Sequence, residues 1–234
     1  MNFELSTNNR VYLCGKIACE PIFSHEIYGE GFYDINLEVP RLSEQCDIIP
    51  ITVSERLFAE KDMSIGTTIA VKGQFRSYNK MVDGKSKLML TVFVREICEP
   101  IANYNSNIIE LVGYVCKEPV FRTTPFKREI CDVLLAVNRA YNKSDYLPCI
   151  AWGRNARFVS ELNIGEKIYL TGRIQSRQYQ KKINENDIET RTAFEVSVSK
   201  ISTENNVDRI LDKSNDNYCD IEMPISHNFS SIEI

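Results

Sequence analysis

The sequence is poor in the side chains and motifs on which most catalytic and metal sites depend. Two of its 234 residues are histidine, and these two, His25 and His227, stand far apart in the chain. The 8 cysteines include no C-x-x-C pair, so the grouped ligands of a zinc site are missing. There is also no G-x-x-x-x-G-K-S/T loop, no H-E-x-x-H and no G-x-S-x-G. We therefore expect a protein that is not an enzyme and that carries no metal or cofactor.

Long apolar runs are missing as well. No stretch approaches the roughly 20 apolar residues that cross a bilayer, and residues 1–6 lack the basic start and apolar core of a signal peptide. Cysteines such as Cys131 and Cys149 occupy apolar positions in strand-like runs, where a reduced thiol behaves as a small buried hydrophobe. These features lead us to expect a cytoplasmic protein with no membrane contact.

The clearest positive feature is an internal repeat. A first pattern, Gly15-x-Ile17-x-x-Glu20-Pro21-Ile22-Phe23, returns later in the chain as Gly113-x-Val115-x-x-Glu118-Pro119-Val120-Phe121. Further pairs fall at the same offset, namely Asp34 and Asp132, Arg41 and Arg139, Asp47 and Asp145, and Pro50 and Pro148. A repeat of about 100 residues has the size of a domain and exceeds the periods of roughly 20–50 residues that mark solenoids. We therefore predict two copies of one domain, called repeat 1 and repeat 2.

Charge is divided unevenly along the chain, whose net charge is −4. Residues 106–203 contain more Lys and Arg than Asp and Glu, whereas residues 1–105 and 204–234 contain more acidic residues. This asymmetry suggests that the parts of the chain have different tasks. The predicted boundaries are 1–102 for repeat 1, 106–203 for repeat 2, and 204–234 for an acidic tail. We expect the tail to be disordered because it is rich in Asn, Asp and Ser and has no periodicity.

Each repeat shows five runs typical of β-strands, with a short helical run between the third and the fourth. In repeat 1 the strands are expected at 11–17, 33–39, 48–53, 68–78 and 88–97, and the helix at 55–62. In repeat 2 the strands are expected at 109–115, 131–137, 147–152, 167–179 and 193–201, and the helix at 155–162. Turn-rich loops are expected at 79–87 and 180–190. This order is that of the OB-fold, so we predict an all-β protein built from two tandem five-stranded OB-fold barrels.

The fourth strand of repeat 2 can be sorted into two faces by its period of two. The face toward the barrel interior would carry Ile168, Leu170, Gly172 and Ile174. On the third strand the small Cys149 and Ala151 suit a crowded interior, which places the sole tryptophan, Trp152, on the outside. Exposed aromatic rings beside cations are typical of single-stranded nucleic-acid sites, because bases stack on the rings and cations contact the phosphates. The candidate contacts in repeat 2 are Trp152, Arg154, Arg173, Gln175, Arg177, Tyr179, Tyr146, Arg139, Tyr141 and Lys143.

Each of these features also has a simpler explanation. A single tryptophan in a strand is more often packed in a core or an interface. The polar row from Arg173 to Arg177 resembles an ordinary solvated face, and Tyr179 could close one end of the barrel. The nucleic-acid interpretation depends on the convergence of these side chains on adjacent positions of one fold.

Four blocks of repeat 2 resemble the bacterial single-stranded DNA-binding protein (SSB) family, in a tandem OB-fold form. They are Leu135-Ala136-Val137-Asn138-Arg139, Asp145-Tyr146-Leu147-Pro148-Cys149-Ile150-Ala151-Trp152-Gly153-Arg154, Leu162-x-x-Gly165, and Leu170-Thr171-Gly172-Arg173-Ile174-Gln175-Ser176-Arg177-x-Tyr179. The resemblance covers nearly all of residues 107–201. It implies sequence-tolerant, non-catalytic binding of single-stranded DNA in replication, recombination or repair, with stacking on the third-strand tryptophan. It also implies four OB-folds per working particle, which two chains would supply as a homodimer.

Repeat 1 resembles the family much less. Ser54 stands at the position of Trp152, and one strand face that would repel phosphate carries Asp34, Asn36 and Glu38. The fourth strand nevertheless directs candidate DNA contacts outward, namely Lys72, Arg76 and Tyr78. We predict that repeat 1 binds DNA more weakly than repeat 2 or serves mainly in assembly.

The tail also departs from the family, whose tails usually end in an acidic run with a Pro-Phe tip that docks partner proteins. A partial echo of that tip occurs at Asp220-Ile221-Glu222-Met223-Pro224-Ile225. The segment is therefore a candidate docking site for replication or repair proteins, and the alternative is a solvated disordered end.

Two further functions remain open at this point. The chain could be an OB-fold scaffold of a replication-restart or plasmid-replication assembly, with marginal DNA contact. It could also be an RNA-binding module, because base stacking alone does not distinguish the sugar.

Overall fold

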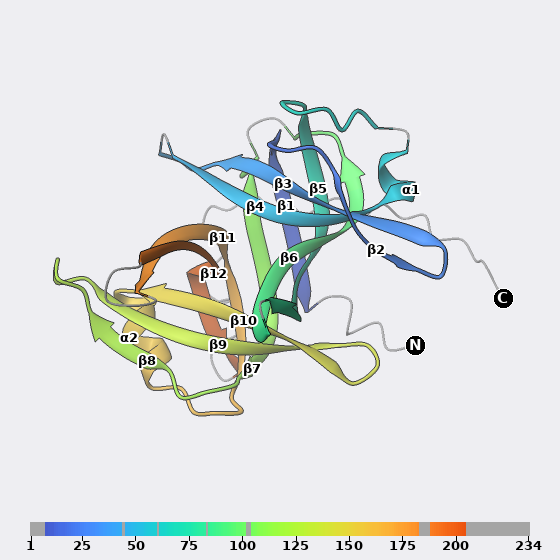
Figure 1. Ribbon diagram of the computed structural model, residues 1–234. Coiled ribbons are helices and arrows are strands. Elements are labelled where there is room, and N and C mark those ends of the chain that lie inside the picture. The colour runs from blue at the N-terminus through green and yellow to red at the C-terminus, as the bar shows by residue number, and fades with distance from the viewer. Residues whose placement is uncertain are drawn as a thin grey trace, which may run out of the picture.

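A computed structural model describes residues 8–43, 45–59, 61–82, 84–101, 104–182 and 188–204. Two β-barrels lie against each other, one formed by the first half of the chain and one by the second (Figure 1). Nearly all of the predicted tail, including the candidate docking segment 220–225, falls outside the described residues. Among the described residues, no helix is long and apolar enough to cross a membrane.

The two halves repeat the same order of elements. Repeat 1 consists of β1 (Asn9–Ile17), β2 (Ile22–Ile27), β3 (Glu30–Pro40), β4 (Cys46–Ser54), α1 (Glu55–Phe58), β5 (Thr68–Val82) and β6 (Lys85–Cys98). Repeat 2 consists of β7 (Asn107–Val115), β8 (Val120–Thr123), β9 (Glu129–Arg139), β10 (Lys143–Trp152), α2 (Arg154–Ser160), β11 (Lys167–Lys182) and β12 (Ile188–Thr203). Each barrel closes through five strands, β1-β3-β4-β6-β5 in one half and β7-β9-β10-β12-β11 in the other. The prediction of two OB-like barrels, each with a helix before its fourth barrel strand, is confirmed.

Three local details differ from the sequence-based expectation. Strands β2 and β8 were not expected, and they pair with β3 and β9 outside the barrels, where every one of their residues is exposed. Because neither face is buried, these strands have no hydrophobic alternation that could reveal them. The segment expected as a loop at 79–87 is instead the end of a long hairpin, with β5 continuing to Val82 and β6 beginning at Lys85. Helix α1 ends at Phe58, earlier than expected.

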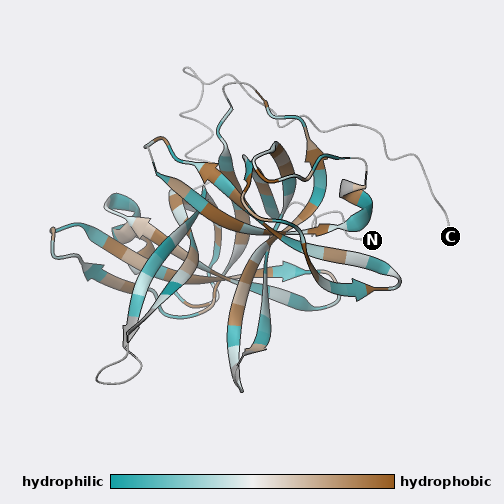
Figure 2. Cartoon of the chain, turned by 45° about the horizontal axis from the view of Figure 1, so that its top comes forward, coloured by the Kyte–Doolittle hydropathy of each residue, from teal (hydrophilic) through white to brown (hydrophobic). Residues whose placement is uncertain are grey.

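Alternation along the barrel strands explains the core. On β9 the side chains that point inward are all buried, namely Cys131, Val133, Leu135 and Val137. Figure 2 shows the corresponding alternation of hydrophobic and hydrophilic residues along the strands. The expectation that Cys131 and Cys149 act as small buried hydrophobes is confirmed, and burial raises the pKa of both thiols.

A glycine permits the barrel of each repeat to close at its fourth strand. The pairing of β11 with β12 shifts register between Thr171 and Gly172, and a Cβ atom on Gly172 would collide with the backbone oxygen of Ser197. The equivalent shift in repeat 1 lies between Lys72 and Gly73. The close approach of two backbones requires glycine at these positions.

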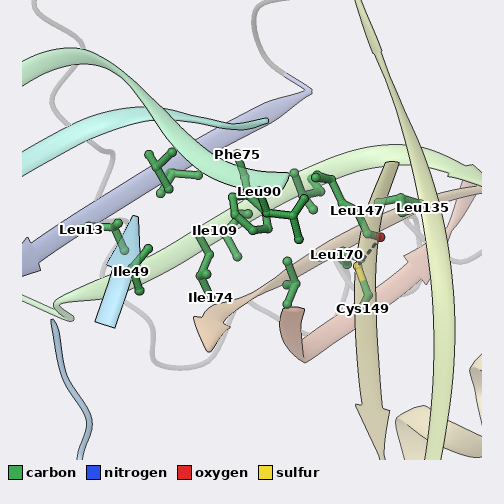
Figure 3. Packing of buried hydrophobic residues seen from close by; sticks show 14 of the residues in the cluster. Leu13, Ile49, Phe75, Leu90, Ile109, Leu135, Leu147, Cys149, Leu170 and Ile174 are labelled. Carbon is green, nitrogen blue, oxygen red and sulfur yellow. Dashed lines mark hydrogen bonds between the residues drawn. The ribbon is translucent and has the colours of Figure 1, made fainter. Parts of the chain in front are cut away.

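The two repeats are joined by backbone pairing and by a shared core. Strand β1 pairs antiparallel with β7, and the register joins Val11 to Ile109 and Asn9 to Leu111. The buried side chains of both halves form one continuous cluster, in which Leu13 and Phe75 of repeat 1 lie near Ile109 and Ile174 of repeat 2 (Figure 3). The repeats are therefore halves of one packed body.

Within each repeat, a buried asparagine ties the first strand to the fourth barrel strand, and the two contacts are pseudo-symmetric. The side chain of Asn9 donates to the Phe75 carbonyl at 2.8 Å and accepts from the Phe75 amide at 2.9 Å. Asn107 does the same with Ile174, at 2.7 and 2.9 Å. Each asparagine side chain thus satisfies a backbone donor and acceptor just beyond the last paired residues of β1 with β5 and of β7 with β11.

Candidate nucleic-acid interface

A buried aspartate of each repeat reaches across to the other repeat. Asp47, at the start of β4, accepts hydrogen bonds from the backbone amide of Ser176 at 2.7 Å and from its hydroxyl at 3.2 Å. Asp145, at the same place in repeat 2, accepts from the backbone amide of Ser77 at 2.7 Å. Both aspartates are 0% exposed. They form what we call the two latches between the repeats.

The latches use two of the predicted DNA-contacting arginines. Arg173 binds the Asp47 carboxylate at 3.2 Å, and Arg139 binds the Asp145 carboxylate at 3.2 Å. Arg41 adds a two-point contact with Asp47, at 2.6 and 2.8 Å. Arg173 therefore helps to hold the repeats together, whereas Arg139 pairs with an aspartate of its own repeat. The capacity of both arginines for phosphate contact is partly occupied.

The two latches differ in how well the carboxylate is neutralised. Burial by itself would raise the pKa of Asp47, but the hydrogen bonds from Arg41 and Ser176 outweigh burial and lower it. Burial dominates at Asp145 and raises its pKa, despite the amide of Ser77 and the charge of Arg139. Among the described residues, the Oδ2 atom of Asp145 is buried without a hydrogen-bond partner. The Asp47 latch is thus the stronger of the two.

The outer face of β10 presents two aromatic rings. Trp152 is 39% exposed and Tyr146 is 45% exposed, so the expectation that the sole tryptophan lies outside the barrel is confirmed. Between them in the chain, Cys149 and Ala151 are buried on the inner face, as predicted. Along a strand, six residues correspond to about 20 Å, which is too far for both rings to contact the same base.

The outer row of β11 lies on the same sheet, because β12 pairs with both β10 and β11. Arg177 is exposed, stands over the Tyr179 ring at 5.9 Å, and is 3.6 Å from the Glu195 carboxylate. Tyr179 is 37% exposed. Gln175 is buried and donates to Glu195 at 2.7 Å, so it positions that carboxylate below Arg177. Arg177 and Tyr179 are the members of this row that face solvent.

The remaining candidates of repeat 2 are distributed around this face. Tyr141 and Lys143 are exposed in and just after the β9–β10 turn, where Tyr141 has a φ of 61°. Arg154 is exposed at the start of α2, two residues after Trp152. The structure therefore gathers exposed cations near both ends of β10.

The candidate DNA contacts of repeat 1 are more strongly engaged in contacts within the protein. Lys72 is 3.5 Å from the Glu96 carboxylate. Arg76 is partly buried and donates to Gln74. Tyr78 is 41% exposed, and burial followed by the charge of Asp34 raises its pKa. Asp34 itself accepts a hydrogen bond from the Thr52 hydroxyl at 2.8 Å.

Sequence reasoning overlooked an aromatic row on repeat 1. Phe93, on β6, has two guanidinium groups over its ring, those of Arg76 and Arg95, at 5.2 and 5.0 Å from the ring centre. Phe32 and His25 continue the row on β3 and β2. The available signal was the alternation of Val92, Phe93 and Val94, which directs Phe93 away from the core.

Comparisons with known proteins agree with this geometry. Residues 106–203 match the model of the single-strand binding protein family, a family of non-catalytic DNA-binding proteins. Single-stranded DNA-binding protein 1 of Staphylococcus aureus is 34% identical over 83 residues, which are 32% of this chain and 50% of that protein. Single-stranded DNA-binding protein A of Bacillus subtilis is 32% identical over 83 residues, covering 32% of this chain and 48% of that protein. The chain thus spans about half the length of these curated relatives.

A solved structure extends the likeness to both repeats. The wild-type single-stranded DNA-binding protein of Thermus aquaticus superposes with a TM-score of 0.64 and 21% identity, over 83% of this chain and 92% of that chain. This likeness concerns the fold of the two halves together. Residues 106–203 are thus similar to the single-strand binding protein family, and the chain as a whole carries two OB-folds in tandem.

Proposed function

We propose that the protein binds single-stranded DNA without catalysis and with little sequence preference, mainly through the outer face of repeat 2. The observation that carries this proposal is the exposed set of Tyr146, Trp152 and Tyr179 beside Arg177, on one sheet of an OB-fold. Aromatic rings of this kind accept any base, because every base has a stacking face. The family match of residues 106–203 supports the same activity.

The proposal also includes a role in the cell, stated only as a general class of processes. Such a protein would protect single strands during replication, recombination or repair, as a cytoplasmic, nucleoid-associated protein. The boundaries 1–102, 106–203 and 204–234 remain our division of the chain, and segment 220–225 remains the candidate docking site for partner proteins.

A homodimer would bring four OB-folds together. Mass measurement by light scattering during size exclusion tests this part, with an expected mass of about twice the 26.9 kDa of one chain. A monomer at every concentration would contradict it.

Competition between nucleic acids tests the proposed ligand. Labelled oligo-dT is expected to be displaced by unlabelled single-stranded DNA and poorly by duplex DNA of equal length. Displacement by RNA at equal concentration would favour an RNA-binding module, and absence of binding at low salt would favour a scaffold.

Binding of single-stranded DNA should weaken as the salt concentration rises. Individual Arg and Lys side chains should each account for a measurable part of this salt dependence. For single-stranded DNA, the logarithm of the binding constant is expected to fall linearly with the logarithm of the salt concentration. The slope should be about −0.7 for each phosphate that the protein neutralises. We expect Arg177→Gln to make the slope shallower by about 0.7, since Arg177 is exposed beside a stacking ring. Arg56→Gln, on α1 of repeat 1, is the matched control and should leave the slope unchanged. A flat salt series for the unmodified protein would contradict phosphate tracking.

A further inference from the structure

Repeat 1 lacks aromatic residues at the places where repeat 2 exposes them. Ser54 occupies the position of Trp152, since Ser54 pairs with Phe32 as Trp152 pairs with Ile130. Ile48 stands at the position of Tyr146, and Lys80 at that of Tyr179. A stacking site of the repeat 2 type is therefore absent from the described part of repeat 1.

A different aromatic row occupies the outer face of the same sheet in repeat 1. His25 stacks on Phe32 with ring centres 5.0 Å apart and an angle of 8° between the rings. Phe32 lies 5.6 Å from Phe93. Arg76 and Arg95 stand over Phe93. We call these five side chains the Phe93 row.

The row lies on the sheet where a strand of nucleic acid could reach it. Phe93 pairs with Thr52 on β4 and with Gln74 on β5, so it stands in the middle of the sheet. His25 and Arg95 are exposed, Phe93 is partly exposed, and Phe32 is buried beneath them at 7% exposure. In repeat 2 the position of Phe93 is held by Ser197, which pairs with Ile150 and Arg173. The third barrel strand of repeat 2 therefore carries an exposed ring, Trp152, whereas in repeat 1 the fifth barrel strand carries the partly exposed ring of Phe93.

The cations of the row make no direct ion pair among the described residues. Neither Arg76 nor Arg95 forms an ion pair among the described residues, and the Nε atom of Arg76 is buried there without a hydrogen-bond partner. Burial, followed by the nearby positive charge of Arg139, lowers the pKa of Arg76 to about 10, and the charge of Asp145 offsets this only in part. A phosphate group would supply the directly contacting anion that this pair of guanidinium groups lacks among the described residues.

The Phe93 row is continuous with the site on repeat 2. The hydroxyl of Ser77, next to Arg76 on β5, accepts a hydrogen bond from the backbone amide of Tyr146 at 2.8 Å. The backbone of Tyr146 therefore lies beside the segment of β5 that carries Arg76. A single strand that stacks on Tyr146 can continue across the latch to Arg76 and Phe93.

We propose that the Phe93 row is a second contact site for single-stranded DNA, in which Phe93 and His25 stack bases while Arg76 and Arg95 contact phosphates. This inference rests on the proposed function of repeat 2. Asp34 lies on the same face, but Thr52 donates to its carboxylate, and the stacking rings bring bases rather than phosphates toward that side.

The test compares long and short oligonucleotides on the full chain. At roughly 4–16 nucleotides per OB-fold, an oligo-dT of about 10 nucleotides fills one site and one of about 30 spans both. The variants are Phe93→Leu, which keeps apolar volume, and Arg95→Gln, which alters an exposed side chain. Phe23→Leu is the matched control, because Phe23 is exposed and its ring contact among the described residues is with Tyr33, which is not part of the row. Thermal unfolding of each variant is measured alongside.

The two oligonucleotides separate this inference from the proposed function. Phe93→Leu should bind the long oligo-dT about 10-fold more weakly, within the range expected for one stacked base. Arg95→Gln should also bind it more weakly, because a phosphate contact is lost. The short oligo-dT should quench Trp152 fluorescence equally in all proteins. Long-oligonucleotide binding equal to the control in both variants, with Trp152 still quenched, would overturn the Phe93 site alone. Failure of the unmodified protein to bind either oligonucleotide would overturn both proposals.

Discussion

Asp47→Asn is expected to lower the free energy of unfolding by about 3 kcal/mol at neutral pH. Removing one partner of a buried ion pair costs about 3–5 kcal/mol, and the low end applies because Arg41 and Arg173 keep some solvent access. The substitution removes the negative charge that two guanidinium groups share. Urea unfolding followed by circular dichroism measures the effect.

Asp145→Asn is the matched control, at the same position of the other latch. It should cost clearly less, because burial already raises the pKa of Asp145 and one of its oxygens has no hydrogen-bond partner among the described residues. An asparagine can still accept the hydrogen bond from Ser77. Equal or greater loss in Asp145→Asn would contradict the asymmetry of the latches.

The two aspartates should make contributions of opposite sign to the pH dependence of the free energy of unfolding, and replacing each by asparagine should remove its contribution. The pKa of Asp47 is lowered in the folded protein, so its stabilisation is present above the unfolded pKa, about 3.9, and disappears as pH falls through the folded value. The pKa of Asp145 is raised, so the penalty of burying its charge disappears as pH falls through that higher folded value. The gap between the unmodified protein and Asp47→Asn should therefore close only in strong acid.

Combined replacement of Tyr146 and Trp152 by alanine is expected to weaken oligo-dT binding by about 2–6 kcal/mol. Each ring is expected to contribute about 1–3 kcal/mol by stacking one base. Because the rings are about 20 Å apart along β10, their effects should add. Fluorescence anisotropy of labelled oligo-dT compares the unmodified protein, each single variant and the double variant.

Conservative replacement separates stacking from packing at this site. Trp152→Phe keeps an aromatic face and should retain most of the affinity that Trp152→Ala loses. Equal losses in the two variants, or an unimpaired double variant, would contradict base stacking on β10.

The architecture could be predicted because it depends on patterns that persist through a whole repeat. Alternation on β9 and β11 and the paired glycines Gly73 and Gly172 follow from burial and barrel closure, which the sequence records directly. Strands β2 and β8 could not be predicted, because both of their faces are exposed and carry no alternation. The long β5–β6 hairpin escaped prediction for the same reason.

The site was harder to predict because its chemistry depends on contacts between the repeats. Arg173 and Arg139 look like phosphate ligands in the sequence, yet each binds a buried aspartate. That the Asp47 latch crosses to Ser176 of the other repeat follows from the β1–β7 pairing, for which the sequence has no local signal. The exposure of Trp152, by contrast, followed from the alternation of β10 alone.

The central claim is that repeat 2 stacks bases on Trp152, and intrinsic fluorescence tests it most directly because the chain has 1 tryptophan. The full-length protein is titrated with oligo-dT at low and at high salt. The account predicts strong quenching of Trp152 at low salt and a weaker binding constant at high salt. Binding detected by anisotropy without any change in Trp152 fluorescence would contradict it.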